Sequence, residues 1–200
     1  MNGWQFETKV TDARTDKRGT WVALETTQFY AEGGGQPPDT GTLADLLVLD
    51  VQRVDDVVWH LLEQALEPGM VVTGVVEEAM RRDHSIQHTA QHVLTALLED
   101  EYGIRTLSFG IGPEESSLEI ETDAFDWTQI ESLERDVQRI IFENRPVLTH
   151  ELPSEEVESD RLRKATERTG TVRIVEIDGL DYNAVAGHMW RRRDSSESST

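Results

Sequence analysis

The sequence predicts an α+β fold: a small β-barrel-like domain over residues 1–78, an α+β domain over residues 79–184, and an atypical tail over residues 185–200. Three observations support this prediction. The first part contains short β-prone runs separated by glycines, the second contains two long segments with helical spacing of apolar residues, and a strand-like run lies near its end. The chain of 200 residues is long enough to bury a hydrophobic core.

The first part is predicted to be rich in β-structure because its apolar residues occur in short runs. These β-prone runs lie at residues 21–24, 46–49 and 71–76. Between the first two runs, Gly33, Gly34 and Gly35 form a loop that is followed by Gln36. Three consecutive glycines allow positive φ angles and a close approach of the backbone to a ligand, although such a loop on its own is more often a plain flexible turn.

The second part is predicted to begin with a helix that is capped by Asp83 and ended by Gly103. The following elements are expected after it: strands at 106–109, 117–121 and 171–177, a helix from Asp126 to Asn144, an extended segment at 146–152 and a polar helix at 154–167. Within the first helix, helical spacing predicts a core-facing stripe. Its residues are Ile86, Ala90, Val93, Leu94 and Leu97.

The opposite face of that helix carries a histidine pair, His88 and His92. Histidines four residues apart project from one helix face about one turn apart, which is the spacing at which two imidazoles bind one metal ion. His84 and Gln91 share the face and are expected to orient the ligands from outside. The pattern thus predicts half of a metal site, with a merely solvated face as the alternative.

The composition limits the classes of function. There is no long apolar run and no secretory leader, so a cytoplasmic protein with no membrane segment is expected, and zero cysteines exclude disulfides and thiolate chemistry. The net charge is −20, and only Lys9, Lys17 and Lys164 are lysines. A dispersed acidic surface that is nearly free of lysine indicates salt adaptation, and it disfavours nucleic-acid binding outside local basic clusters.

Some of the basic residues form local clusters and are candidates for contacts with RNA. An arginine face balanced by nearby glutamates is the competing explanation. The candidates are Arg81, Arg82, Arg161, Arg163 and Lys164.

Several motifs occur in an order that resembles the AlaX family, the freestanding relatives of the alanyl-tRNA synthetase editing domain. The resemblance covers roughly residues 20–184. It rests on Phe29-Tyr30-x-Glu32-Gly33-Gly34-Gly35-Gln36, Asp39-Thr40-Gly41, Arg82-x-His84, His88-Thr89-Ala90-Gln91-His92 and Asp178-Gly179-x-Asp181-Tyr182-Asn183. Because the glycine-rich N-terminal domain is present, the chain looks like the medium-length form of this family, which is also related to the editing domain of threonyl-tRNA synthetases.

The resemblance implies a hydrolase that deacylates mischarged tRNA for alanine, chiefly tRNA charged with serine or glycine, with zinc as cofactor. In the α+β editing domain, His88 and His92 match the first pair of zinc ligands on a helix that packs against an antiparallel sheet. Gln36 and the three glycines match the loop beside the aminoacyl pocket. Thr27 matches a threonine whose hydroxyl recognises a serine side chain, and a plain strand threonine is its alternative.

The chain departs from the family after Ala184. The family continues with Cys-Gly-Gly-Thr-His-Val, whereas this chain reads Val185-Ala186-Gly187-His188-Met189-Trp190. These residues can be encoded by GTG GCG GGA CAC ATG TGG after an alanine codon GCT. A reading that starts one base earlier gives TGT GGC GGG ACA CAT GTG, which encodes the six family residues. We therefore predict that residues 185–200 are translated out of frame. In the chain as printed, His188 is the candidate third metal ligand.

Three functions are compatible with the sequence. The first is an editing hydrolase whose C-terminal motif has been lost through the frame change. The second is a catalytically degenerate module that binds aminoacyl-tRNA without hydrolysing it. The third is a metal hydrolase that acts on some other small ester.

Overall fold

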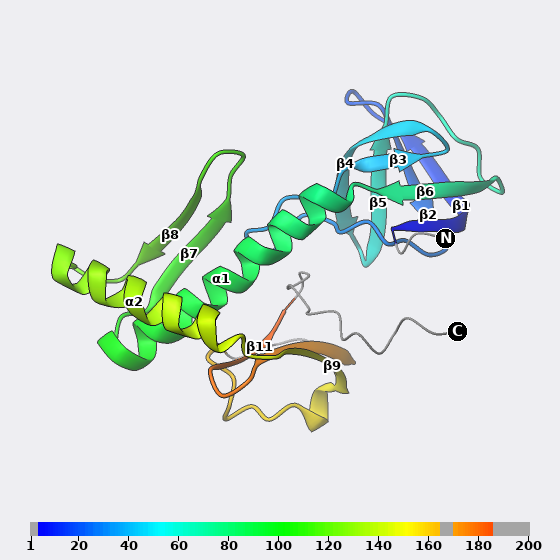
Figure 1. Cartoon of the computed structure of the whole chain (residues 1–200). Helices are drawn as coiled ribbons and strands as arrows, with labels where there is room; N and C mark the ends of the chain where they lie inside the picture. Colours follow the sequence, from blue (N-terminus) through cyan, green and yellow to red (C-terminus); the bar gives the residue numbers. More distant parts are fainter. Residues whose placement is uncertain (1–3, 165–169, 186–200) are drawn as a thin grey trace. The chain divides into compact units, whose positions relative to one another are not determined.

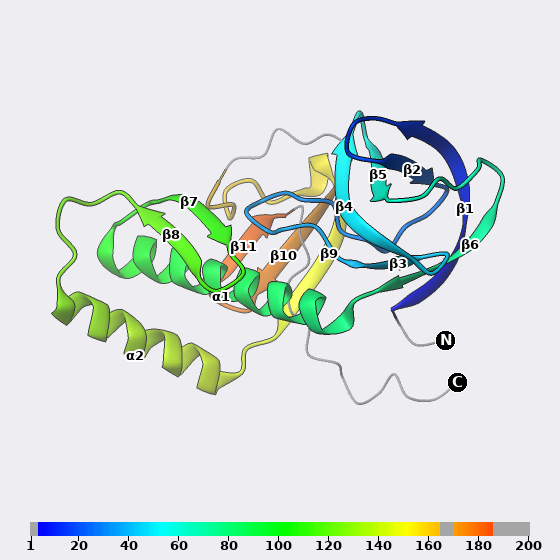
Figure 2. The ribbon, with the colours of Figure 1, turned by 90° about the horizontal axis from the view of Figure 1, so that it is seen from above.

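Six antiparallel strands close into a barrel at the N-terminal end of the chain (Figure 1). In the computed structural model, which describes residues 4–164 and 170–185, the strands hydrogen-bond in the order β1-β2-β5-β4-β3-β6. Their bounds are β1 Gln5–Thr15, β2 Thr20–Leu24, β3 Gly41–Leu43, β4 Leu46–Val54, β5 Val57–Leu62 and β6 Val71–Val76. Figure 2 shows these strands curving around a common centre. The predicted runs at 21–24, 46–49 and 71–76 are confirmed as strands.

Along the barrel strands, successive side chains alternate between the core and solvent. Strand β1, for example, buries Phe6, Thr8 and Val10 while the residues between them are exposed. Phe6 and Val10 belong to a buried cluster with Val22, Leu43 and other apolar residues from the barrel strands. This period of two is what a sheet with one buried face requires.

Two tight hairpins connect β3 to β4 and β4 to β5. Ala44 and Asp45 have φ angles of 51° and 64°, and Asp55 and Asp56 have φ angles of 49° and 63°. Positive φ at both central residues is typical of the type I′ turn, whose twist matches that of the flanking strands. Neither turn contains the glycine that usually marks it, and β3 and β5 were not predicted from the sequence.

Helix α1 (Glu78–Tyr102) begins in the first of two compact units, Met1–His84, and continues into the second, Ser85–Thr200. It starts five residues before the predicted cap at Asp83, so that cap is wrong. Its end at Gly103 is confirmed: Gly103 has a φ of 65°, and its N–H donates to the carbonyl of Glu99.

The second unit combines α1 with another helix, a hairpin and a small sheet. These elements are β7 (Thr106–Ile111), β8 (Ser116–Ile120), α2 (Trp127–Glu143), β9 (Val147–Pro153), a 3₁₀ turn η1 (Ser154–Glu156), β10 (Thr171–Ile177) and β11 (Asp181–Ala184). Strands β7 and β8 pair with each other, and the sheet has the order β11-β10-β9. The α+β class is thereby confirmed.

Helices and sheet share one core in the second unit. Val93 and Leu97 of α1, Ile140 of α2, and Val175 and Ile177 of β10 form one buried cluster. The predicted second helix is confirmed closely, because Asp126 accepts a hydrogen bond from the Gln129 N–H in a capping box. The predicted polar helix at 154–167 is wrong over residues 154–164, which contain only η1.

No helix among residues 4–164 and 170–185 is long and apolar enough to span a bilayer.

Candidate functional site

The histidine pair of α1 lies on the buried side of the helix. His88 and His92 are 4% and 8% exposed, whereas Ile86, which was predicted to face the core, is 49% exposed. Ala90 is exposed as well. The predicted assignment of faces is therefore wrong for this half of the helix. Burial of imidazoles at these positions is possible because other elements of the second unit surround them with polar and aromatic partners.

Asp181 of β11 is the polar partner of His92. The His92 Nδ1 lies 2.7 Å from a carboxylate oxygen of Asp181, whose side chain is 1% exposed. Burial alone would raise the pKa of Asp181, but hydrogen bonds from His92, Asn183 and Arg163 outweigh it and lower the pKa below 3.8. An ionised carboxylate only accepts, so His92 donates its Nδ1 proton. When the ring is neutral, the lone pair of His92 then lies on Nε2.

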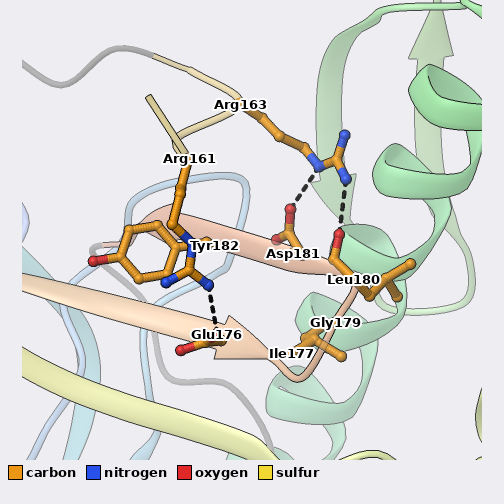
Figure 3. Close-up of a pocket in the computed structure, with 8 residues that line it drawn as sticks. All are labelled: Arg161, Arg163, Glu176, Ile177, Gly179, Leu180, Asp181 and Tyr182. Atoms are coloured by element: carbon orange, nitrogen blue, oxygen red, sulfur yellow. Dashed lines mark hydrogen bonds and ion pairs between the residues drawn. The ribbon is translucent and has the colours of Figure 1, made fainter. Parts of the chain in front are cut away.

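Arg163 fixes Asp181 from the other side (Figure 3). Its Nε donates to Asp181 at 2.8 Å, one terminal nitrogen donates to the Leu180 carbonyl at 2.8 Å, and both terminal nitrogens bind Asp100 at 2.7 Å. Asn183 also donates to both oxygens of Asp181. The carboxylate that holds His92 is thus itself held by two side chains, which gives the imidazole one preferred orientation.

His88 stacks on His92 with ring centroids 5.1 Å apart, and it lies near Phe109 of β7, 6.4 Å between centroids. Burial, together with the nearby charges of His92 and Arg173, lowers the pKa of His88 from 6.5 to about 4. A neutral imidazole is the form that binds metal ions. The pair therefore fits two positions of a zinc site. Within residues 4–164 and 170–185, no group of three or more histidine and carboxylate side chains is arranged to hold a metal.

A cavity of about 240 Å³ lies beside Asp181. It is lined by Arg161, Arg163, Glu176, Ile177, Gly179, Leu180, Asp181 and Tyr182. Arg161 donates to Glu176 at 2.6 Å and lies over the Tyr182 ring at 4.2 Å. The charged side chains that line the cavity pair with one another, Arg161 with Glu176 and Arg163 with Asp181. The volume of the cavity is below the range of about 300–1,000 Å³ that ligand pockets usually have. We interpret it as a packing gap around the Asp181 network.

The glycine loop of the first unit is a closed turn. Gly33 and Gln36 exchange reciprocal backbone hydrogen bonds, and the Tyr30 hydroxyl donates to the Gly33 carbonyl at 2.6 Å. Gly34 and Gly35 have φ angles of 60° and 78°, which confirms the predicted positive φ at these two glycines. Gln36 itself is 1% exposed, so its side chain packs inside the unit.

Thr27 follows β2 and binds a histidine that the sequence analysis did not single out. The Thr27 hydroxyl lies 2.8 Å from Nε2 of His60, a residue of β5 that is fully buried. It also accepts a hydrogen bond from the Phe29 N–H at 3.1 Å. The Thr27 residue as a whole is half-buried, so part of it is accessible from solvent.

Comparison with known proteins decides the family. Residues 3–80 match the family described as tRNA synthetases class II (A). The alanyl-tRNA editing protein AlaX-M of Methanosarcina acetivorans is 30% identical over 202 residues, which cover 92% of this chain and 81% of that protein. The chain belongs to the alanyl-tRNA editing protein family. Two longer relatives are the mouse alanyl-tRNA editing protein Aarsd1, 34% identical over 184 residues, and AlaX-L of Pyrococcus horikoshii, 30% identical over 193 residues.

The chain spans less than half of the length of these longer members of the editing family. The aligned region covers 88% of this chain and 45% of the mouse protein, and 92% of this chain and 47% of the Pyrococcus protein. Membership of the family therefore agrees with the resemblance that the sequence motifs indicate. His188 lies outside the described residues, and so do all residues of the segment 185–200 that we predict to be out of frame, except Val185.

Two of the five predicted tRNA contacts, Arg81 and Arg163, have side chains that are largely buried among partners. Arg81 is 6% exposed, and its guanidinium binds Asp39 and the Gln28 carbonyl. Arg163 is occupied by Asp100, Asp181 and Leu180. Each of these two arginines is thus engaged within its own unit, which leaves its guanidinium poorly placed for phosphate contacts.

The other three basic residues are exposed. Arg82 pairs with Glu78 at 3.6 Å, and Arg161 pairs with Glu158 and Glu176. Lys164 is exposed next to Arg163. Of the two residues that we expected to orient the ligands, Gln91 donates instead to Thr95, and His84 is buried with no hydrogen-bond partner for Nδ1 among the described residues. The orienting group for His92 is Asp181, which lay in a quoted motif but had no predicted role.

Proposed function

We propose that this chain derives from a trans-editing hydrolase that deacylates tRNA for alanine when it is mischarged with serine or glycine. Relatives that bear the name alanyl-tRNA editing protein support the general activity. The preference for seryl and glycyl esters, and the dependence on zinc, are part of the proposal. The observation that carries it is the buried pair of His88 and His92, with His92 oriented by Asp181.

The residues around the histidine pair have distinct proposed roles. His88 is held neutral by burial, and Asp181 keeps the Nδ1 proton on His92, so both rings have a lone pair for a metal. Zinc, when bound, would supply a Lewis acid that polarises the ester carbonyl or orients the substrate. The buried surroundings of the pair exclude bulk water from the imidazoles and favour a single geometry.

The exposed cations Arg82, Arg161 and Lys164 are the proposed contacts for tRNA phosphates. They are few against a net charge of −20, so we expect binding of tRNA to weaken steeply with added salt. Replacing Arg82 or Lys164 with glutamate should lower the affinity for charged and uncharged tRNA equally, since phosphate contacts do not read the amino acid.

A second candidate is a module that binds aminoacyl-tRNA without hydrolysing its ester. The chain as printed contains no cysteine, and within the described ranges His88 and His92 are the only metal ligands that we propose. Structural and catalytic zinc sites normally have at least three protein ligands. The printed chain is therefore proposed to bind zinc weakly, and hydrolysis is assigned to the reading frame that restores Cys-Gly-Gly-Thr-His-Val.

Resequencing the gene across codons 180–200 is the first experiment. The protein with the restored motif is then incubated with seryl-tRNA, glycyl-tRNA and alanyl-tRNA, and release of the amino acid is measured. We expect deacylation of the first two, loss of more than 100-fold of activity in the H88A and H92A variants, and no loss in H150A. His150 is the matched control because it lies in β9 of the same unit and pairs with Glu176.

Three results would separate the candidates. Turnover by the restored protein alone supports the editing hydrolase. Tight binding of charged tRNA by both proteins with turnover by neither supports the binding module. Cleavage of simple esters while all aminoacyl-tRNAs are ignored would support the third possibility, a metal hydrolase with another substrate.

A further inference from the structure

His60 is a fully buried titratable residue of the barrel that the proposed chemistry at the His88 and His92 pair does not use. It lies in β5, its ring packs against Phe29 with centroids 5.4 Å apart, and its relative exposure is 0%. Its Nδ1 lies 3.1 Å from the carbonyl oxygen of Val22 on the neighbouring strand β2. A carbonyl oxygen can only accept, so Nδ1 carries the proton and donates it.

The other ring nitrogen must then accept. Burial lowers the pKa of His60 to about 4, so the ring is neutral at neutral pH. A neutral imidazole with its proton on Nδ1 has a lone pair on Nε2. The 2.8 Å contact between Nε2 and the Thr27 hydroxyl is therefore a bond in which Thr27 donates.

This bond fixes what the Thr27 hydroxyl can offer to a ligand. The hydroxyl has one proton and two lone pairs. The hydroxyl proton is used in the hydrogen bond to His60, and one lone pair accepts the hydrogen bond from the Phe29 N–H at 3.1 Å. By this count one acceptor position remains on a half-buried residue, and no donor. A ligand group that binds the Thr27 hydroxyl must therefore be a hydrogen-bond donor.

We propose that His60 is a specificity-positioning residue, which holds the Thr27 hydroxyl as a pure acceptor so that it selects an aminoacyl ester with a side-chain hydroxyl. The inference rests on the proposed function. A seryl group can donate its hydroxyl proton to Thr27, whereas glycyl and alanyl groups have no side-chain donor. Because one neutral hydrogen bond is at stake, the preference due to this contact should be roughly tenfold.

Three substitutions separate this role from simple packing. H60N keeps an amide N–H near the position of Nδ1, which can bind the Val22 carbonyl, but removes the acceptor for Thr27. H60Q places an amide oxygen near the position of Nε2 and so keeps that acceptor. T27V has nearly the same shape as threonine and removes the hydroxyl itself. A packing role would be disturbed by both His60 variants, whereas the positioning role predicts that H60Q retains function.

The probes are hydrolysis-resistant analogues, 3′-seryl-amino-3′-deoxyadenosine and its alanyl counterpart, titrated against the full chain. We expect the wild type and H60Q to prefer the seryl analogue about tenfold. H60N and T27V should bind both analogues with nearly equal affinity. A seryl preference that persists in H60N would overturn the inference.

A second measurement does not depend on any variant or on activity. Nitrogen NMR of histidine-labelled protein should show His60 as the neutral tautomer protonated at Nδ1 at neutral pH. Protonation at Nε2 would overturn the inference, because Thr27 would then have to accept from His60. If neither the printed chain nor the protein with the restored motif binds either analogue, the proposed function fails, and the specificity role fails with it. If both analogues bind with equal affinity to the wild type, only the role of His60 fails.

Discussion

His92 and Asp181 are 89 positions apart in the sequence and form a buried hydrogen bond of 2.7 Å. The carboxylate is held by Arg163 and Asn183, so it is positioned before any metal arrives. This relationship explains why an imidazole is tolerated on the buried side of α1. It also makes Asp181 the residue that determines which nitrogen of His92 is available.

The first prediction concerns D181N. An amide can turn its NH₂ group toward His92, which favours a proton on Nε2 and removes the lone pair that a metal needs. We expect zinc affinity of the protein with the restored motif to fall about 10–100-fold, as for other groups that orient metal-bound histidines. The measurement is a competition titration with a chromophoric chelator. D178N is the matched control, because Asp178 is exposed and lies on the turn before β11. Equal affinities of D181N and D178N would refute the role.

The second prediction concerns the buried pair of Arg81 and Asp39, whose side chains are 7% and 1% exposed. Asp39 also accepts from the Tyr30 N–H at 2.6 Å. D39N leaves the Arg81 charge buried without its anion, so we expect the free energy of unfolding of the barrel to fall by about 3–5 kcal/mol. Urea denaturation measures it.

The neighbouring pair of Arg82 and Glu78 supplies the control. Both side chains are 52% exposed and the ions are 3.6 Å apart. Because exposed ion pairs contribute little, R82A should change stability by less than about 1 kcal/mol. A similar loss of the free energy of unfolding in D39N and R82A would show that the buried Arg81 pair contributes no more to stability than an exposed pair.

The third prediction concerns the hairpin between β4 and β5. Asp56 has a φ of 63°, a conformation that is unfavourable for a residue with a Cβ atom. D56G should therefore stabilise the barrel by about 0.5–1 kcal/mol, measured as a higher urea midpoint. E63G, at an exposed position without positive φ, should instead destabilise it, since there glycine only increases the entropy of the unfolded chain.

These turns also show where prediction from the sequence ends. Elements with a local signal were predicted well: the strand Thr171–Ile177 has a regular apolar run, and α2 has Asp126 at its cap. Strands β3 and β5 were missed because Ala44-Asp45 and Asp55-Asp56 lack the glycine that usually marks a two-residue hairpin.

The candidate site shows the same limit. The spacing of His88 and His92 could be read locally, but the face that they occupy depends on Asp181 and Phe109, which other elements bring to α1. Apolar spacing alone favoured Ile86 and Ala90 as core residues, and tertiary packing placed them outside. The partner of Thr27 was equally hidden, because His60 lies 33 positions away in a strand that the sequence did not reveal.

The last prediction follows from the buried state of His60. In the folded barrel its pKa is about 4, and in the unfolded chain it is 6.5, because burial disfavours the charged ring. Above pH 6.5 the ring is neutral in both states, and its contribution to stability does not change with pH. Between pH 6.5 and 4 only the unfolded chain takes up the proton, so stability falls as the pH is lowered. The full loss over this window is on the order of 3 kcal/mol.

Trp21 and Trp59 are buried in the barrel, so in a W127F/W190F background their fluorescence reports unfolding of the barrel, which matters because His88 in the second unit has a similarly lowered pKa. Urea midpoints are compared at pH 7.5 and pH 4.5 for the wild type and for H60Q. We expect H60Q to lose less stability on acidification than the wild type, since a glutamine takes up no proton. Parallel losses in the two proteins would mean that His60 takes up its proton as readily in the folded barrel as in the unfolded chain, which would contradict its lowered pKa.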